Sequence, residues 1–333
     1  MDVWKRGEQP AITNYVDYAL FVAFFPQLVA GPIVRAAYFL PQLARPSHEP
    51  IPIAAALLLI LGGMVKKVII ANYLATGLVD PVFAAPDQYG GPDLLLATYG
   101  YAVQIYCDFS AYTDIAIALA ALCGFHFPRN FDQPYRALRL REFWQRWHMS
   151  LSFWLRDYLY KPLGGNRHGR LNTYRNLMIT MLLGGIWHGA AWKFVMWGAL
   201  HGGGLAVERM CQPWLGQRPA TPLGKFVSWL VVFHFVCFAW IFFRAEDFTV
   251  AAVFIARLGA GWGEPAQQAQ PAMVGLIVIG MAGQFLPPGA FGRAGQALRR
   301  VPYWGLGAAA GIGLAAINAL GPEGIAPFIY FRF

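Results

Sequence analysis

Long apolar runs, separated by short polar, glycine-containing or proline-containing stretches, make up most of the chain. A helix needs about 20 apolar residues to cross a hydrocarbon core roughly 30 Å thick. The apolar runs are 17–34, 51–65, 93–125, 176–207, 225–243, 273–286 and 303–320. We therefore predict an all-α fold, a polytopic bundle of membrane helices.

Two of these runs are not expected to be simple straight spans. The run 17–34 contains Pro26, Gly31 and Pro32, which interrupt helical hydrogen bonding and favour a kinked or re-entrant helix. The run 93–125 is longer than a bilayer requires. We expect this second run to tilt, to break or to be shielded by other parts of the protein.

Two carboxylates, Asp108 and Asp114, lie inside the run 93–125. A carboxylate at mid-membrane costs roughly 2.5–3.5 kcal/mol even on the lenient insertion scale, and such residues commonly face a bundle interior. The residues that helical spacing places along one face are Tyr101, Gln104, Asp108 and Tyr112. We expect this face to look into the bundle or into a polar tunnel.

The stretch 137–160 carries apolar residues at steps of three and four, with charged residues on the other side. Two acid–base pairs, Glu142 with Arg146 and Asp157 with Lys161, have the order that favours pairing on a helix surface. The pattern predicts one amphipathic helix lying in the membrane interface.

Composition agrees with a membrane protein, because 57% of the residues are apolar and only 13% are charged. The formal charge of +9 would suggest a nucleic-acid partner in a soluble protein. Here the segment 125–175 holds ten basic and three acidic residues, a surplus of seven, interleaved with aromatic residues. Such a block between spans is typical of a cytoplasmic loop on anionic headgroups, so we expect membrane lipid as a partner and no nucleic acid.

Two histidines stand beside tryptophans, His148 next to Trp147 and His188 next to Trp187. The glycines around His188 in GGIWHGAAW leave room for a substrate, and a dry site would keep a neutral imidazole available as a general base. A histidine such as His148 is often only a residue of the interfacial belt, so its case depends on partnership with His188. We interpret His201 as a packing residue.

Other binding chemistries find little support in the sequence. The chain has no H-x-x-x-H or H-E-x-x-H pair, so we expect no metal site. The run LGGNRHGR, residues 163–170, matches neither a Walker loop nor a dinucleotide fingerprint, so we expect no bound nucleotide cofactor.

Several long motifs carry a family resemblance. The runs are FFPQLVAGPIVR, IYCDFSAYTDIAIALA, NFDQPYRALRLREFWQRWHMSLSFWLRDYLYKPLGGNR, LLGGIWHGAAWKFVMWGALHG and PFIYFRF. Together they resemble the bacterial alginate O-acetylation branch of the membrane-bound O-acyltransferase superfamily. The resemblance implies transfer of an acyl group, expected to be acetyl, from a cytoplasmic thioester such as acetyl-CoA towards an extracytoplasmic polysaccharide such as alginate. It also implies a multi-pass protein of the bacterial inner membrane that works with periplasmic acetyl-transfer proteins.

The same resemblance implies roles for individual residues. His188, in the W-H-G motif, would be the catalytic base, and His148 would assist it by orienting the thioester or the developing oxyanion. Substrate-binding or tunnel positions are expected at Trp187, Trp147, Arg146, Asp108, Gln104 and Ser152.

Residues 1–333 are expected to form one membrane-embedded domain. Relatives of this type have additional helices before the FFPQLVAGP run, so the sequence predicts an N-terminally truncated member. Two alternatives stay open. The intramembrane Asp108 and Asp114, with the glycine-rich helices, would also suit a transporter or flippase for a polysaccharide precursor. The short N-terminal part would suit a non-catalytic remnant.

Overall fold

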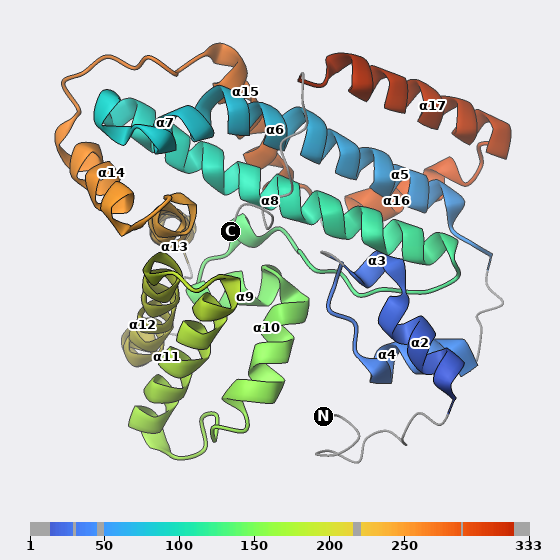
Figure 1. Ribbon diagram of the computed structural model, residues 1–333, viewed down its shortest axis with the longest axis horizontal. Coiled ribbons are helices and arrows are strands. Elements are labelled where there is room, and N and C mark those ends of the chain that lie inside the picture. The colour runs from blue at the N-terminus through green and yellow to red at the C-terminus, as the bar shows by residue number, and fades with distance from the viewer. Residues whose placement is uncertain (1–13, 29–30, 45–49, 216–220, 288, 323–333) are drawn as a thin grey trace. The chain divides into compact units, whose positions relative to one another are not determined.

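The computed structural model describes residues 14–28, 31–44, 50–215, 221–287 and 289–322, and every regular element in these ranges is a helix (Figure 1). This confirms the predicted all-α class. The described residues form two compact units. The first unit takes in residues up to Lys67 together with 109–130 and 287–321, and the second takes in 68–108 and 131–286.

The start of the first unit contains three short helices, α2 (Tyr15–Ala23), α3 (Phe25–Leu28) and α4 (Ala36–Ala44). The predicted kink in the run 17–34 is confirmed, because Phe24 adopts an extended backbone between α2 and α3. Phe24 and Phe39 are buried with Phe127 in an aromatic cluster that anchors these short helices.

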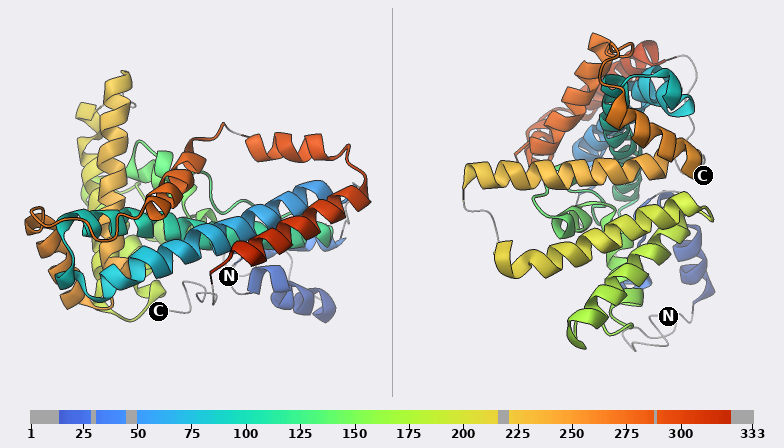
Figure 2. Two further views of the ribbon diagram at one scale, coloured as in Figure 1. Left: turned by 90° about the horizontal axis from the view of Figure 1, so that it is seen from above. Right: turned by 90° about the vertical axis from the view of Figure 1, so that its left-hand side faces the viewer.

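A continuous helical stretch, Ile53–Ala84, follows. It consists of α5 (Ile53–Met64), a π-helical segment (Val65–Ala71), α6 (Asn72–Leu74), a second π-helical segment (Ala75–Val79) and α7 (Asp80–Ala84). The run predicted at 51–65 is therefore the first half of a longer helix. In the first unit α16 (Ala290–Leu298) and α17 (Tyr303–Leu320) pack against α5, and α17 runs beside it (Figure 2).

Helix α8 (Gly91–Leu122) is a single unbroken helix of 32 residues. The expected break does not occur, and the expected shielding does, since 56% of its apolar window is buried. Tyr101, Gln104 and Asp108 are buried, whereas Tyr112 is 36% exposed, so the predicted inward face holds for three of its four residues.

The charge of Asp114 is balanced inside the first unit. The ammonium of Lys66 donates to the Asp114 carboxylate at 2.6 Å and to the Ser110 hydroxyl at 2.9 Å. Lys66 lies in the first π-helical segment. An ion pair with an added hydrogen bond is the usual way to accommodate a carboxylate within an apolar helix pair.

In the second unit, the helices that carry the candidate site begin with α9 (Leu140–Arg146) and α10 (Met149–Leu155). A π-helical turn (Arg156–Tyr160) follows them. The prediction of a single amphipathic helix over 137–160 is therefore wrong at the centre of that range. The chain breaks there because Trp147 is extended and His148 is left-handed, with φ 41° and ψ 56°. Burial of Trp147 at 4% exposure shows that tertiary packing overrides the helical periodicity. Both predicted acid–base pairs are formed.

Next come α11 (Gly169–His188) and α12 (Trp192–Leu215), which form an antiparallel pair, followed by α13 (Pro222–Arg244) (Figure 1). The unit ends with α14 (Phe248–Ala260) and α15 (Pro271–Ala282). The apolar run expected at 176–207 is thus two helices with a break at Gly189.

Within the described residues, four helices are long and apolar enough to span a membrane, and a fifth if α15 and α16 count as one broken span. They are Ile53–Ala84, Gly91–Leu122, Pro222–Arg244 and Tyr303–Leu320. The predicted run at 225–243 lies within α13, and the run at 303–320 coincides with α17. Helices α11 and α12, which the sequence placed in the membrane, do not meet the same test.

The close approach of α11 and α12 depends on two glycines. A Cβ built on Gly198 would meet the carbonyl oxygen of Met181, and one on Gly185 would meet that of Phe194, both well inside van der Waals contact. At Gly203, in contrast, a Cβ would lie 3.8 Å from the Met178 methyl group, an ordinary contact.

Replacing Gly198 by alanine should therefore push the two helices apart. We expect Gly198→Ala to lower the free energy of unfolding by about 1–3 kcal/mol, the typical cost of overpacking. Gly203→Ala, on the same helix, should be neutral or slightly stabilising because alanine favours the helix. Thermal unfolding in detergent micelles measures both variants. Equal midpoints would show that the glycine contact does not hold the pair together.

Candidate functional site

His188 is the last residue of α11 and sits among aromatic rings. Its ring centroid lies 5.0 Å from Trp187, 5.2 Å from Trp197 and 5.0 Å from Phe243, with edge-to-face geometry. Phe194 completes the group at 6.4 Å. These four rings, from α11, α12 and α13, are called the aromatic cage below. His188 as a whole residue is half-buried, and its Nδ1 is enclosed by the surrounding side chains.

His148 occupies the turn between α9 and α10 and is 4% exposed. Among described residues other than glycine, only His148 and Gln133 have positive φ. A left-handed conformation costs a residue with a Cβ about 1–2 kcal/mol, and such strain is concentrated at functional sites. Ser152 stabilises the turn, because its amide donates to the His148 carbonyl at 2.9 Å and its hydroxyl donates to the Trp147 carbonyl at 3.1 Å.

Trp187 brings the two histidines together. Its ring lies 6.4 Å from His148 and 5.0 Å from His188, measured between centroids. Burial lowers the pKa of His148 to about 3, and the nearby His188 adds a smaller effect in the same direction. His148 is therefore a neutral imidazole at physiological pH. Trp187 is 55% exposed, so the ring that both histidines contact reaches the protein surface.

The remaining predicted site residues serve more varied purposes. Trp147 is buried and stacks on Phe143 at 5.6 Å, as a core residue. The Arg146 guanidinium donates to the Asp132 carboxylate and carbonyl, both at 3.0 Å, and pairs with Glu142. Its donors are thus engaged in holding α9.

Gln104 and Asp108 are buried at 6% and 3% exposure on α8. The aromatic rings in contact with His148 and His188 do not belong to α8. Helix α8 reaches this region through Tyr106, whose ring lies 5.9 Å from Phe131, and Phe131 in turn stacks on His148 at 6.5 Å. The two polar side chains are therefore on an element that supports the site.

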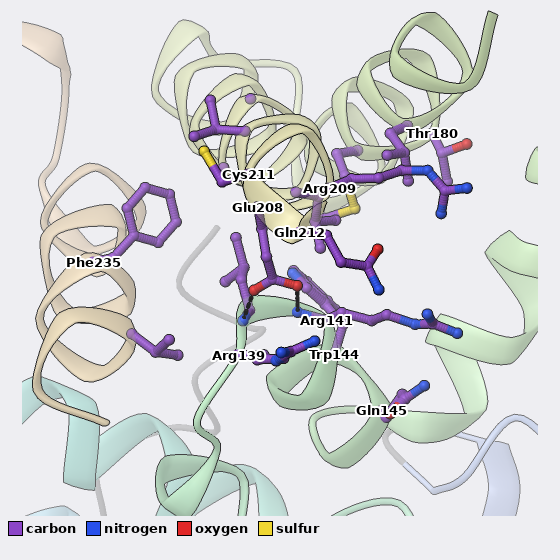
Figure 3. A pocket seen from close by; sticks show the side chains of 18 of the residues that line it. Arg139, Arg141, Trp144, Gln145, Thr180, Glu208, Arg209, Cys211, Gln212 and Phe235 are labelled. Carbon is purple, nitrogen blue, oxygen red and sulfur yellow. Dashed lines mark hydrogen bonds between the residues drawn. The ribbon is translucent and has the colours of Figure 1, made fainter. Parts of the chain in front are cut away.

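A cavity of about 1530 Å³ opens between α9, α10, α11, α12 and α13 (Figure 3). Its inner walls are mainly apolar side chains of α11, α12 and α13. The basic residues that line it are Arg139, Arg141, Arg156, Lys161, Arg167 and Arg209. Several of them belong to the basic segment noted in the sequence, but the cavity itself requires five helices and could not be foreseen.

Glu208 is a site residue that the sequence did not reveal. Its carboxylate accepts hydrogen bonds from the backbone amides of Leu140 and Arg141, and Figure 3 shows it reaching from α12 to the first turn of α9. A carboxylate at a helix N-terminus is favoured by the helix dipole. Glu208 thereby fixes α9, and with it the turn that carries His148, against α12.

A chain of contacts runs from the cavity wall to His188. Trp144 lines the cavity, and its indole Nε1 donates to Nδ1 of the fully buried His201 at 3.2 Å. The ring of Trp197 lies 4.9 Å from His201 and 5.2 Å from His188. His201 is therefore packed, as the sequence suggested, but it also bonds to the cavity wall.

Residues 5–245 match the family described as MBOAT, membrane-bound O-acyltransferase family, so the chain belongs to that family. Over 251 residues it is 46% identical to a probable alginate O-acetylase AlgI of Azotobacter vinelandii, covering 75% of this chain and 49% of that protein. Over 355 residues it is 38% identical to a probable alginate O-acetylase AlgI of Pseudomonas putida, covering 100% of this chain and 72% of that protein.

A third relative is the peptidoglycan O-acetyltransferase of Helicobacter pylori, 41% identical over 240 residues, which cover 71% of this chain and 45% of that protein. The chain spans about half the length of the Azotobacter and Helicobacter relatives. Family membership and the apolar helices make it a multi-pass membrane protein.

The low pKa of His148 makes stability depend on pH. The unfolded value is near 6.5 and the folded value about 3, so below pH 6.5 the unfolded chain binds a proton that the folded chain does not. Acid should therefore destabilise the fold through His148, by about 2 kcal/mol between pH 7 and pH 5. In His148→Asn, this contribution of about 2 kcal/mol to the acid destabilisation should disappear. Asparagine tolerates positive φ, so the turn is kept.

Chemical unfolding in micelles at the two pH values measures this difference. A His148→Asn protein with the same acid loss as the unmodified protein would show that His148 is not held neutral by burial.

Proposed function

We propose that this protein transfers an acyl group, in the first instance acetyl, from a thioester to a hydroxyl acceptor, as a step towards O-acetylation of a polysaccharide. The observation that carries the proposal is the placement of His148 and His188 against the same ring, that of the exposed Trp187. The names of the similar proteins, alginate O-acetylases and a peptidoglycan O-acetyltransferase, support the same chemistry.

His188 is the general base in this reaction. Its neutral imidazole takes the proton of the attacking hydroxyl as the oxygen adds to the thioester carbonyl. When the tetrahedral intermediate collapses, the carbon–sulfur bond breaks and the imidazolium returns the proton to the departing thiolate. The products are an ester and a free thiol, and the base is restored. His148 orients the reactants through a neutral ring, held in position by the strained turn.

The donor enters through the basic cavity in this proposal. Acetyl-CoA, or another acyl thioester of the cytoplasm, carries phosphates that suit the cationic lining, while its thin pantetheine arm suits the apolar interior. The donor is a substrate, and no resident cofactor is required. The basic segment then faces the cytoplasm, and the protein resides in a bacterial inner membrane.

The acceptor is proposed to be an extracytoplasmic polysaccharide such as alginate or another exopolysaccharide. Because the chain spans about half the length of several relatives, their acceptors and partners enter here as proposals for this protein. Periplasmic acetyl-transfer proteins would hand the acetyl group on to the polymer.

Removal of the base tests the central step. We expect His188→Ala to abolish thioester-dependent acetyl transfer, a fall of at least 10²-fold, since general base catalysis contributes about 10²–10⁴-fold. The assay follows free thiol released from acetyl-CoA by the protein in lipid nanodiscs. His234→Leu is the matched control, because His234 is exposed on α13 and bonds to Tyr99 and the Leu230 carbonyl. Normal turnover by inserted His188→Ala protein would contradict the proposal.

Charge reversal in the cavity tests the route of the donor. Arg141→Glu should raise the KM for acetyl-CoA several-fold and reduce its dependence on salt, because a screened attraction to phosphate is lost. Arg170→Glu makes the same charge change at an exposed position of α11 outside the cavity lining, and should leave KM nearly unchanged. Equal effects of both substitutions would point to a general field and not to the cavity.

A further inference from the structure

Two buried ring nitrogens of α12 have no hydrogen-bond partner among the residues that the structure describes. Trp197 is 2% exposed and His201 is 0% exposed. The indole Nε1 of Trp197 and Nε2 of His201 have no hydrogen-bond partner within the described part of the chain. Leaving a buried donor unsatisfied costs about 1–3 kcal/mol, so each such group calls for an explanation.

The hydrogen bond from Trp144 defines the state of His201. The indole of Trp144 can only donate, so Nδ1 of His201 accepts and carries no proton. In the neutral ring the proton then resides on Nε2, which becomes a donor. Trp144 thus fixes the tautomer in which His201 presents an N–H on the side of the ring away from the cavity wall.

The two donors are placed together by the helix that carries them. Trp197 and His201 are four residues apart on α12, so they lie on one face of that helix, one turn from each other. Their ring centroids are 4.9 Å apart, and the Trp197 ring is 5.2 Å from His188. Trp197 therefore contacts the proposed base directly, and His201 lies next to Trp197 on the same face of α12.

We propose that the Trp197 indole N–H and the His201 Nε2–H are the donors that stabilise the oxyanion of acyl transfer. This inference rests on the proposed function. As the hydroxyl oxygen deprotonated by His188 bonds to the thioester carbon, the carbonyl π electrons move to oxygen, and the two N–H groups donate to that anion. The carbonyl re-forms when the thiolate leaves and takes the proton from His188. The donors exchange no proton.

A transition-state role accounts for donors that are left unsatisfied at rest. Dipoles fixed beforehand in a dry site stabilise charge that develops only during the reaction, and they need no reorganisation at that moment. The rings around them, the aromatic cage with Trp144 and Phe143, are apolar and strengthen such an interaction. A structural water bridging both donors is the competing explanation, and it predicts no effect on turnover.

Two substitutions remove the donors one at a time. Trp197→Phe deletes the indole N–H and keeps an aromatic ring. His201→Asn deletes the Nε2 donor, while its amide oxygen can still accept from Trp144. For each we expect kcat with acetyl-CoA to fall by about 10²–10³-fold, as for the loss of one oxyanion donor elsewhere, with KM within about threefold. His201→Gln, whose longer amide returns a donor near Nε2, should be at least about tenfold more active than His201→Asn.

Trp240→Phe is the matched control. Trp240 is equally buried and its ring stacks on Trp197 at 5.9 Å, but its N–H already bonds to the Tyr135 hydroxyl at 3.2 Å. Its loss should lower the thermal midpoint and leave kcat within about threefold. If His201→Asn does not fold, Trp197→Phe against Trp240→Phe decides the question.

The outcomes separate this inference from the proposed function. Turnover that depends on His188 but survives Trp197→Phe within threefold would overturn the oxyanion assignment and leave the acyltransferase standing. Equal losses in Trp197→Phe and Trp240→Phe would assign the effect to packing, and would also overturn it. No thiol release from acetyl-CoA by the unmodified protein would remove the reaction on which both ideas rest.

Discussion

The close contact between α11 and α12 is the constraint on which the site depends. Gly185 and Gly198 let the backbone of each helix approach a carbonyl group of the other, a separation that no side chain would permit. Only at that distance can Trp197, on α12, lie against His188 at the end of α11. The glycines that looked like a general feature of a membrane helix are thus specific to the surroundings of His188, the proposed base.

Helix α12 also organises the second histidine. Glu208 holds the first turn of α9, and His201 accepts the indole hydrogen bond of Trp144, which belongs to the same short helix. The left-handed His148 follows one turn later and is buried despite its strain. The contacts of Glu208 and His201 on α12 therefore fix α9, which leads into the His148 turn. The close packing of α11 on α12 fixes His188. The strained turn is maintained because its surroundings leave it no alternative.

Much of the fold could be predicted from the sequence, because long apolar runs have few solutions in a membrane. The helices at 225–243 and 303–320 and the break near Pro26 follow directly from such runs. The prediction of one amphipathic helix over 137–160 was wrong at His148. Hydrophobic periodicity shows which side of a helix is apolar, but it does not show that burial of Trp147 interrupts the helix. The cavity could not be predicted from the sequence, for a different reason. Its lining comes from five helices, and only their packing brings Arg141 and Arg209 to one space.

The charged residues of the site and its two histidines lie in different surroundings. Its cations line the cavity, where the phosphates of the proposed donor would be held, whereas both histidines lie among aromatic rings. A neutral His148 next to His188 adds no positive charge that would oppose proton uptake by the base. An arginine in the aromatic cage would stabilise an oxyanion more strongly, but it would also hinder protonation of His188 at the same moment. Neutral N–H donors such as those of Trp197 and His201 avoid that conflict, which is a physical reason for finding indole and imidazole there.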